Sequence, residues 1–455
     1  MPVSLLLEGV VDFIWGPPLV AFIFLANFYL LTKSRLRPLL LARHGLSLIL
    51  KREVDVADGL SHYKTFCNAI AATVGLGNIS GVAIAVKQGG PGVVVWMWVA
   101  ALLGMNMKFF ECSAALVLRE KDRRGMWRGG AMIGARRLFP KHGNKLALLF
   151  SVCGLVGTLS MFQVNQISSL ASENYAIDPR LTAGVLLVLT SWVLWGGLRR
   201  LSNVCATIVP AMSVLYVGAC LLILGANAEH LPGVFMSIVR GAFDPGAAVG
   251  GVASYGVIHV MLTGIKRATF SNEAGLGTAP LAHANSASQE PIAEGLVAML
   301  GPIFDTMLVC SLTALVVLVS FPGGVLPAAT GILITMRAFS MNLGVAGEVF
   351  LAASVALFGF STILGMANYN QKCWDDLFED RWFGGPLGYR AWYLGTIAMG
   401  AVVTSANVIN LIDIAYGLMT IPNIIVTLGA APMVVDELRK YVDGHLWKTK
   451  ERQRA

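Results

Sequence analysis

The sequence predicts an all-α polytopic membrane protein of about eleven transmembrane helices, ten of which form two five-helix repeats of opposite orientation. Three observations support this fold class: the composition, the spacing of the apolar segments, and two interrupted segments at corresponding positions. Of the 455 residues, 56% are hydrophobic and only 13% are charged, and the mean hydropathy is +0.68. These values exclude a soluble globular chain of ordinary composition.

The charge and the cysteines exclude other classes. The net charge of +8 does not indicate nucleic-acid binding, because the basic residues stand in short runs between apolar segments. The seven cysteines lie within or beside apolar segments without metal-binding spacing, which predicts buried thiols. Glu8 and Asp12 precede the first apolar stretch in place of a basic region, so we expect a retained span rather than a signal peptide.

Eleven apolar segments approach the length that a bilayer core requires, roughly 20 residues. The expected spans are 13–31, 65–87, 92–118, 146–170, 181–197, 204–225, 262–285, 295–320, 346–371, 390–410 and 413–434. The short, glycine-rich stretch 246–261 is expected to be a helix that lies over the outer face.

The basic residues orient these spans. With the N-terminus outside, 27 Lys and Arg residues fall in inner loops and six fall outside, which is a strong positive-inside signal. We therefore expect a multi-pass protein of the plasma (inner) membrane with a cytoplasmic C-terminus. The expected units are an extra N-terminal helix with a basic loop (1–60), a first repeat (61–225), an outer loop or helix (226–261), a second repeat (262–436) and a basic tail (437–455).

The second expected span is interrupted at its centre by Gly75, Leu76, Gly77 and Asn78. Glycines and an amide weaken helical hydrogen bonding at a depth where no water replaces the lost bonds. The freed peptide groups then need another partner, which in transporters is the cargo. The alternative interpretation is that the glycines only permit close packing of neighbouring helices.

The interruption recurs in the second half of the chain. The string GLGN at 75–78 is followed 200 residues later by GLGT at 275–278, within the seventh span. Each interrupted span opens a run of five spans, which is the sequence trace of an inverted repeat. Because five spans separate the two, the halves are antiparallel and both breaks lie near the midplane, where they could share one site.

The chemistry of such a site follows from its peptide dipoles. Interrupted helices present N–H groups that carry roughly half a positive charge and carbonyls that carry roughly half a negative charge. A zwitterionic amino acid together with Na⁺ would satisfy both. Ser361 and Thr362 in the ninth span offer adjacent hydroxyl oxygens for a cation, although such hydroxyls often bond to their own helix backbone instead.

Several strings carry a resemblance to a known family. ATVGLGNISGVA, GGPGVVVWMWVAALLGM, KRATFSNEAGLGTAPLAHA, EGLVAMLGPIFDT and FSTILG resemble, in this order, runs of the amino acid:cation symporter family, the alanine/glycine:sodium symporters. The resemblance implies the five-plus-five inverted-repeat, leucine-transporter-like fold of the wider neurotransmitter:sodium symporter-like superfamily, with one extra N-terminal helix. It also implies symport of small neutral amino acids by alternating access, with Na⁺ as the co-transported ion.

The resemblance also implies site residues. The implied sodium ligands are the backbone carbonyls of Ala71 and Val74 and the hydroxyls of Ser361 and Thr362, and Asn78 is a candidate ligand of a second ion. The N–H groups of Leu76 and Gly77 would hold the substrate carboxylate, and the amide oxygen of Gln163 would accept from its ammonium. The full implied substrate set is Thr73, Leu76, Gly77, Gln163, Phe270, Asn272, Met366 and Asn370.

The chain departs from the family pattern in two places. Where the family usually has tryptophan after FSTILG, and a glycine-glutamate pair farther on, this chain has Met366 and then Asn370 and Gln371. A flexible thioether in place of an indole should enlarge the side-chain pocket, so we expect neutral amino acids larger than alanine to be accepted. The family motif GGPMYY is GGAMIG here, at 129–134, so no role is carried over to that loop.

Charged side chains inside predicted spans raise the free energy of membrane insertion unless they pair with another group or line a water-filled cavity. Lys108 and Glu111 stand three residues apart on the third span and are expected to pair. Glu273 is expected to hold the backbone of the second break in shape, or alternatively to bind a proton or cation. Asp305 is expected to contact the end of a neighbouring helix.

Lys266 and Arg267 are expected at the outer mouth, where they would steer a carboxylate or snorkel to the interface.

Other function classes have less support. A membrane-embedded enzyme lacks HExxH, GxSxG or paired-acid spacing in this sequence. A channel, an uncoupled exchanger or a proton-coupled transporter of the same fold stays open. The expected partners are the amino-acid substrate and membrane lipid, without nucleic acid.

Overall fold

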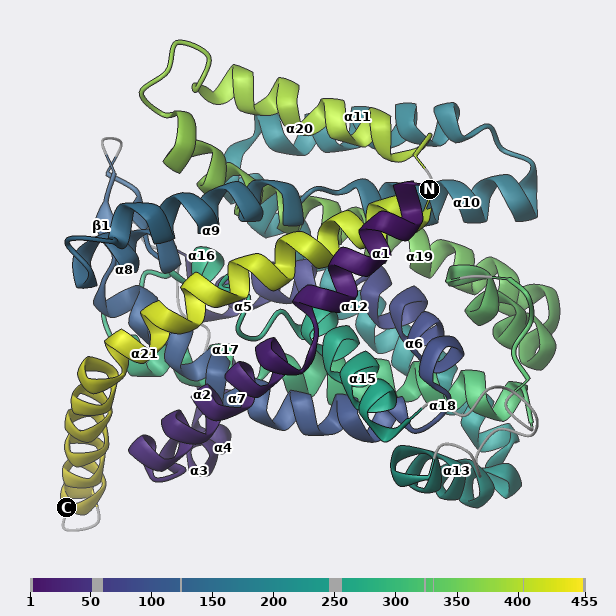
Figure 1. The fold of residues 1–455 in the computed structure, drawn as a ribbon, viewed down its shortest axis with the longest axis horizontal. Helices are drawn as coiled ribbons and strands as arrows, with labels where there is room; N and C mark the ends of the chain where they lie inside the picture. The colour runs from purple at the N-terminus through teal and green to yellow at the C-terminus, as the bar shows by residue number, and fades with distance from the viewer. Residues whose placement is uncertain are drawn as a thin grey trace.

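The computed structural model describes residues 3–50, 60–122, 125–244, 256–322, 325–329, 331–403 and 405–452. This part of the chain is almost entirely helical (Figure 1). Its one sheet in the described ranges is an antiparallel pair, β1 (Glu120–Lys121) with β2 (Trp127–Arg128).

The N-terminal unit packs along the end of the chain. α1 (Val3–Ile14) and α2 (Pro17–Ser34) together form one candidate membrane span. It starts earlier than the expected span 13–31, because residues 3–12 are helical as well. Trp15, between the two helices, donates from its indole Nε1 to the carbonyl of Asp413, 2.8 Å away. This bond ties the extra helix to α21 (Ser405–Arg452). Two short helices, α3 (Arg37–Leu40) and α4 (Ala42–Leu50), follow.

The helices of the first expected repeat follow the predicted segments. They are α5 (His62–Thr73), the π-helix η1 (Gly77–Gly81), α6 (Val82–Gly89), α7 (Val93–Val117), α8 (Ala131–Leu138), α9 (Gly143–Gly157), α10 (Met161–Tyr175), α11 (Pro179–Trp195) and α12 (Gly197–Ala226). The expected span 146–170 is divided between α9 and α10 by a break at 158–160, which we did not predict.

The rest of the chain contains the second group. Its elements are the 3₁₀ turn η2 (Ala228–His230), α13 (Leu231–Phe243), α15 (Val257–Asn272), α16 (Ala279–His283), α17 (Pro291–Ala298), the π-helix η3 (Ile303–Cys310), α18 (Ser311–Ser320), α19 (Ile332–Phe378), α20 (Pro386–Gly400) and α21. α19 includes a non-helical residue, Gly344, so the expected span 346–371 is preceded by an unpredicted helical segment. Of the stretch expected to lie over the outer face, 246–255 is outside the described residues and 257–261 belongs to α15.

Seven helices in the described ranges are long and apolar enough to cross a membrane, and α5 with η1 and α6 adds a bent pair. The expected spans 181–197, 262–285 and 390–410 correspond to α11, to α15 with α16, and to α20, which are shorter. The polytopic all-α class is therefore confirmed, while the count of eleven stays a prediction.

The distribution of polar and apolar side chains is inverted relative to a soluble protein. Val188 on α11 and Leu222 on α12 are each 70% exposed, whereas Asn78, Glu273 and Asp305 are fully buried. Apolar side chains on the outside suit hydrocarbon, and polar groups inside bond to one another. In Figure 1 the β1–β2 hairpin, α8 and the end of α21 lie at the left, while α13 lies at the right.

A buried carboxylate joins the start of α5 to the second group. Glu294 on α17 accepts from His62 Nδ1 at 2.5 Å, from His283 Nδ1 at 2.6 Å and from the hydroxyl of Ser286 at 2.8 Å. Beside it, Leu60 forms a parallel bridge with Ser286. This cluster ties the start of α5, next to the basic segment 33–64, to α17.

We expect Glu294→Gln to lower the free energy of unfolding by about 2 kcal/mol or more, because the new amide places a donor against imidazole donors in a dry site. Thermal unfolding of the purified protein measures the change. Glu290→Gln, at the exposed residue that precedes α17, is the control. Equal melting temperatures for the two variants would contradict the structural role of Glu294.

Candidate substrate and ion site

The first interruption leaves backbone groups without helical partners. α5 ends at Thr73, Val74 has extended dihedrals, and the two halves of the span are bent by 47°. The N–H of Gly75 donates to Asn78 Oδ1 at 3.2 Å instead of to a helix carbonyl. Within the described chain, the backbone carbonyls of Ala71 and Val74 receive no backbone donor. The interruption that the sequence predicted is therefore present.

The start of the second half-helix completes this break. The N–H groups of Leu76 and Gly77 have no hydrogen-bond acceptor among the described residues, as expected for the first turn of a helix. Asn78 also donates from its Nδ2 to the carbonyl of Asp305, 3.1 Å away, which fixes the break against η3. Free carbonyls thus end one half-helix and free N–H groups begin the other.

The second interruption separates α15 from α16. Glu273 has a φ of 56°, and Gly275 and Gly277 have φ values of 85° and 83°. The left-handed region is sterically strained for a residue with a Cβ. A hydrogen bond across the turn stabilises Glu273 in this conformation, because the Thr278 hydroxyl donates to Glu273 Oε2 at 2.7 Å. Asn423 on α21 donates to the carbonyl of Gly275 at 2.9 Å. Glu273 thus holds the turn, as expected.

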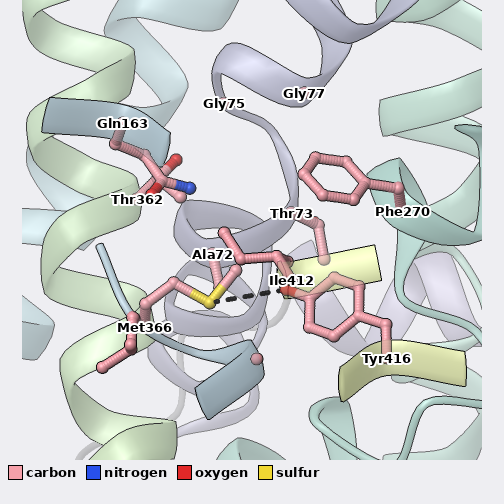
Figure 2. A pocket seen from close by; sticks show the side chains of 12 residues that line it. Ala72, Thr73, Gly75, Gly77, Gln163, Phe270, Thr362, Met366, Ile412 and Tyr416 are labelled. Atoms are coloured by element: carbon pink, nitrogen blue, oxygen red, sulfur yellow. Dashed lines mark hydrogen bonds between the residues drawn. The ribbon is translucent and has the colours of Figure 1, made fainter. Parts of the chain in front are cut away.

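A cavity lies between the first break and the helices that face it (Figure 2). α5 and η1 contribute one wall, Phe270 on α15 a second, α9 and α10 a third, and α19 and α21 the rest. The lining residues are Ala72, Thr73, Gly75, Gly77, Gly157, Leu159, Gln163, Phe270, Thr362, Met366, Ile412 and Tyr416.

Five of the expected substrate residues line this cavity: Thr73, Gly77, Gln163, Phe270 and Met366. The Oε1 atom of Gln163 is buried and has no hydrogen-bond partner among the residues that the structure describes. An orphaned acceptor of this kind is costly in a dry interior, so it fits a ligand donor such as an ammonium group.

Three expected substrate residues lie outside the lining. The side chain of Leu76 is buried in the core. Asn272 accepts from the N–H of Ala274 at 2.9 Å and so shapes the second break. Asn370 donates from Nδ2 to the carbonyl of Leu155 at 2.8 Å, which joins α19 to α9. Their side chains hold the walls rather than face the cavity.

The two hydroxyls of the expected sodium site differ. Thr362 Oγ1 is buried and has no hydrogen-bond partner in the described part of the chain. A Cβ built on Gly75 would lie 2.0 Å from it. Ser361 Oγ donates to the carbonyl of Phe358 at 3.0 Å, within its own helix. Thr362 thus presents a free oxygen to the break, while Ser361 would have to rotate. Asn78, the candidate for a second ion, already uses its oxygen on Gly75.

Two lining residues on α21 were missed by sequence reasoning. Ile412 and Tyr416 face the cavity from the last helix (Figure 2). The Tyr416 hydroxyl contacts Met366 Sδ at 4.0 Å, and its ring lies 5.6 Å from that of Phe270. A tyrosine in an apolar span was the only available signal, and it does not specify which cavity the ring faces.

Arg267 is not an exposed side chain at the interface. It is 5% exposed, and its guanidinium donates to Asp413 Oδ2 at 3.1 Å. The same guanidinium carbon lies 5.6 Å from the centre of the Phe270 ring. The expectation that Arg267 snorkels to the interface is therefore wrong, because it is buried and pairs with Asp413 next to the cavity wall. Its place at the outer mouth and its steering of a carboxylate stay predictions.

The expected pair of Lys108 and Glu111 is also wrong. Lys108 is 2% exposed and makes no ion pair in the described part of the chain. Glu111 instead accepts from Asn423 Nδ2 at 2.7 Å. Lys108 interacts electrostatically with Glu111, Glu273 and Asp305 together. One buried cation thus offsets three buried carboxyls behind the two breaks.

A sequence model of the sodium:alanine symporter family matches residues 3–455. The chain belongs to this family. The match covers the interrupted helices and every wall of the cavity, so the cavity is that of a transporter family rather than of an enzyme.

Characterised and uncharacterised relatives agree with the family. The chain is 32% identical to the sodium/alanine symporter AgcS of Methanococcus maripaludis, over 96% of each protein. It is 33% identical to a Bacillus subtilis protein named "Probable sodium/glutamine symporter GlnT", over 84% of this chain and 79% of that protein. It is 34% identical to an uncharacterised transporter of Haemophilus influenzae, over 97% and 96%.

Solved structures share the fold of this family member. The structure of MhsT in complex with L-phenylalanine superposes with a TM-score of 0.59 at 13% identity, and covers 82% of this chain and 89% of MhsT. A manganese transporter of Eremococcus coleocola superposes with a TM-score of 0.53 at 12% identity, over 82% and 81%. At these identities the likeness shows the fold alone, a leucine-transporter-like arrangement.

We expect Gly75→Ala to abolish amino-acid uptake, because the added methyl group would overlap Thr362 Oγ1 and force α19 away from the break; overpacking typically costs about 1 to 3 kcal/mol. Gly81→Ala is the matched control, since a Cβ there meets nothing within 4 Å. In Gly75→Ala/Thr362→Ala we expect thermal stability to return in part without uptake. Normal uptake by Gly75→Ala would contradict the close approach.

Proposed function

We propose that this chain is a sodium-coupled symporter of small neutral amino acids that works by alternating access. The observation that carries the proposal is the set of orphaned polar groups around the first break: the carbonyls of Ala71 and Val74 and the hydroxyl of Thr362. Oxygen ligands of this kind suit a small hard cation. The family and the relative AgcS, which is named for sodium and alanine, point to the same cargo.

The substrate would lie beside the ion. Its carboxylate would accept from the N–H groups of Leu76 and Gly77, where the half-helix dipole favours negative charge. Its ammonium would donate to Gln163 Oε1. Phe270, Met366 and Tyr416 would surround the side chain. Each contact uses a group that has no other partner or lines the cavity.

Ion binding would link the two moving parts. A sodium ion held between α5 and Thr362 would tie the broken helix to α19 and lower the free energy of the closed state. The substrate then binds a site that the ion has already ordered. Coupling of this kind typically amounts to about 1 to 3 kcal/mol, and rocking of the two repeats about the site would release both cargoes inside.

For the topology we propose eleven spans, an inverted repeat, an outer N-terminus and a cytoplasmic C-terminus in the plasma (inner) membrane. The basic loop around α8 and the end of α21 lie on one side of the molecule, and α13 lies on the opposite side (Figure 1). This arrangement fits the excess of Lys and Arg in the expected inner loops.

A proton-coupled mechanism is the second candidate, because one buried carboxylate lies in the second break. Glu273 Oε1 has no hydrogen-bond partner in the described chain. Uptake into proteoliposomes under separate gradients of sodium, lithium, potassium and protons distinguishes the two. Accumulation driven by sodium alone supports our proposal, and accumulation driven by protons without sodium overturns it.

We expect Ser361→Ala/Thr362→Ala to lose the sodium dependence of uptake and most of its rate, with Thr362→Ala alone accounting for the larger share. Ser354→Ala is the control, since that hydroxyl lies on the same helix and bonds to the carbonyl of Phe350 at 2.9 Å. Unchanged sodium activation in the double variant would exclude the ion site.

For the substrate range, we expect serine, methionine and glutamine to compete with alanine uptake, because Met366 leaves more room than a tryptophan would. Met366→Trp should keep alanine uptake and lose competition by methionine and glutamine. Met399→Trp, at a residue exposed on α20, is the control. Strict preference of the unaltered protein for glycine and alanine would contradict the wider pocket.

A further inference from the structure

A second cavity lies away from the substrate site, between the end of α2, the start of α3 and the distal part of α21. It is lined by Lys33, Ser34, Arg35, Arg37, Val435, Leu438 and Arg439. Four of these seven residues are cationic, and they come from two parts of the chain that are 400 residues apart. Nothing in the proposed transport cycle uses this cavity.

Within the described chain, only one of the four cations of this basic cavity, Arg439, has a carboxylate partner. Lys33, Arg35 and Arg37 form no ion pair with the described part of the chain. Arg439 meets Asp436 on its own helix at 3.5 Å, with both side chains 64% exposed, and an exposed pair of this kind contributes little. Four converging cations without a carboxylate among the lining residues repel one another, so the cavity favours an anionic occupant.

The depth of the cavity indicates a lipid. The first expected span ends at residue 31 and the last ends at residue 434, and every lining residue follows one of these ends within eight residues. The cations therefore lie at the level of the headgroups of the inner leaflet, where Lys and Arg meet lipid phosphates. Val435 and Leu438 contribute buried apolar side chains to the wall.

An apolar path leads from the cavity into the bilayer. Lys33 Nζ lies 5.6 Å from the ring of Tyr29, one turn earlier on α2. Leu25, a further turn along the same ridge, is 69% exposed. Residues four apart share a helix face, so Leu25, Tyr29 and Lys33 form a strip from hydrocarbon to headgroup. An acyl chain on this strip would place its phosphate at the cations.

The turn after α2 presents these cations. Arg35 and Leu36 have φ values of 51° and 59°, a conformation that residues with a Cβ seldom adopt. This turn places Arg35 and Arg37 at the same cavity as Lys33. A bound anion would offset the repulsion among them.

We propose that this basic cavity binds the phosphate of an anionic glycerophospholipid of the inner leaflet, and that the lipid joins the N-terminal helix to α21. The proposal rests on the membrane orientation given above and is independent of sodium coupling and of the substrate.

The test is equilibrium binding to the purified full chain without sodium or substrate. Thermal unfolding is measured in micelles with added phosphatidylglycerol, with phosphatidylcholine, or with inorganic phosphate. We expect phosphatidylglycerol to raise the melting temperature at concentrations at which the other two do not. In Arg35→Gln/Arg37→Gln its apparent affinity should fall by about tenfold or more, since each cation near an anionic surface contributes about 1 kcal/mol.

Lys141→Gln/Lys145→Gln is the control, because it removes two exposed cations at the start of α9 and just before it and should keep the response. Arg439→Gln probes the opposite wall and should weaken binding as well; it serves if the double variant does not fold. Retained affinity in both cavity variants, or an equal loss in the control, would show diffuse surface attraction and overturn the proposal. An equal response to inorganic phosphate would overturn the lipid as the occupant. Uptake in phosphatidylcholine liposomes should be unchanged in the cavity variants, which separates this test from that of the transport function.

Discussion

The structure depends on peptide groups that lose their helical partners inside a protein core that water does not fill. At 74–75 and 273–278 the chain leaves the helix, and each freed group must bond to a side chain, to another helix or to a cargo. Asn78, Asn272 and Asn423 satisfy some of these groups. Two groups that stay without a partner in the described chain, Gln163 Oε1 and Thr362 Oγ1, belong to residues that line the cavity beside the first break.

Charged side chains around the two breaks are also buried, and they interact with other buried charges. Lys108 offsets three carboxyls without pairing closely with any of them, and Arg267 pairs with Asp413 beside the wall that Phe270 forms. Buried charges of this kind fix the relative positions of helices more than they add stability. Glu294 does the same at the other end of α5, where two imidazoles and a hydroxyl share one carboxylate. The start of α5 is thus tied to α17 through His62, and the break after α5 is tied to η3 through Asn78.

Sequence reasoning found what is encoded locally. Both interruptions could be predicted, because glycine and asparagine in the middle of an apolar span change hydrogen bonding wherever they occur. The break at 158–160 was missed, because the fourth span kept its overall hydropathy. The prediction that Lys108 pairs with Glu111 was wrong, because it used only their spacing on one helix. That spacing does not show that Asn423, 312 residues away in the sequence, donates a hydrogen bond to Glu111. The bond of Arg267 to Asp413 and the inward position of Tyr416 depend on packing for the same reason.

The indole of Trp15 begins a series of contacts that leads from the N-terminal helices to the cavity. It holds the carbonyl of Asp413, whose carboxylate holds Arg267, whose guanidinium lies against Phe270 at the cavity. Three contacts therefore connect the N-terminal helices α1 and α2 to the wall that Phe270 forms. A displacement of α1 and α2 would therefore be passed through Asp413 and Arg267 to Phe270.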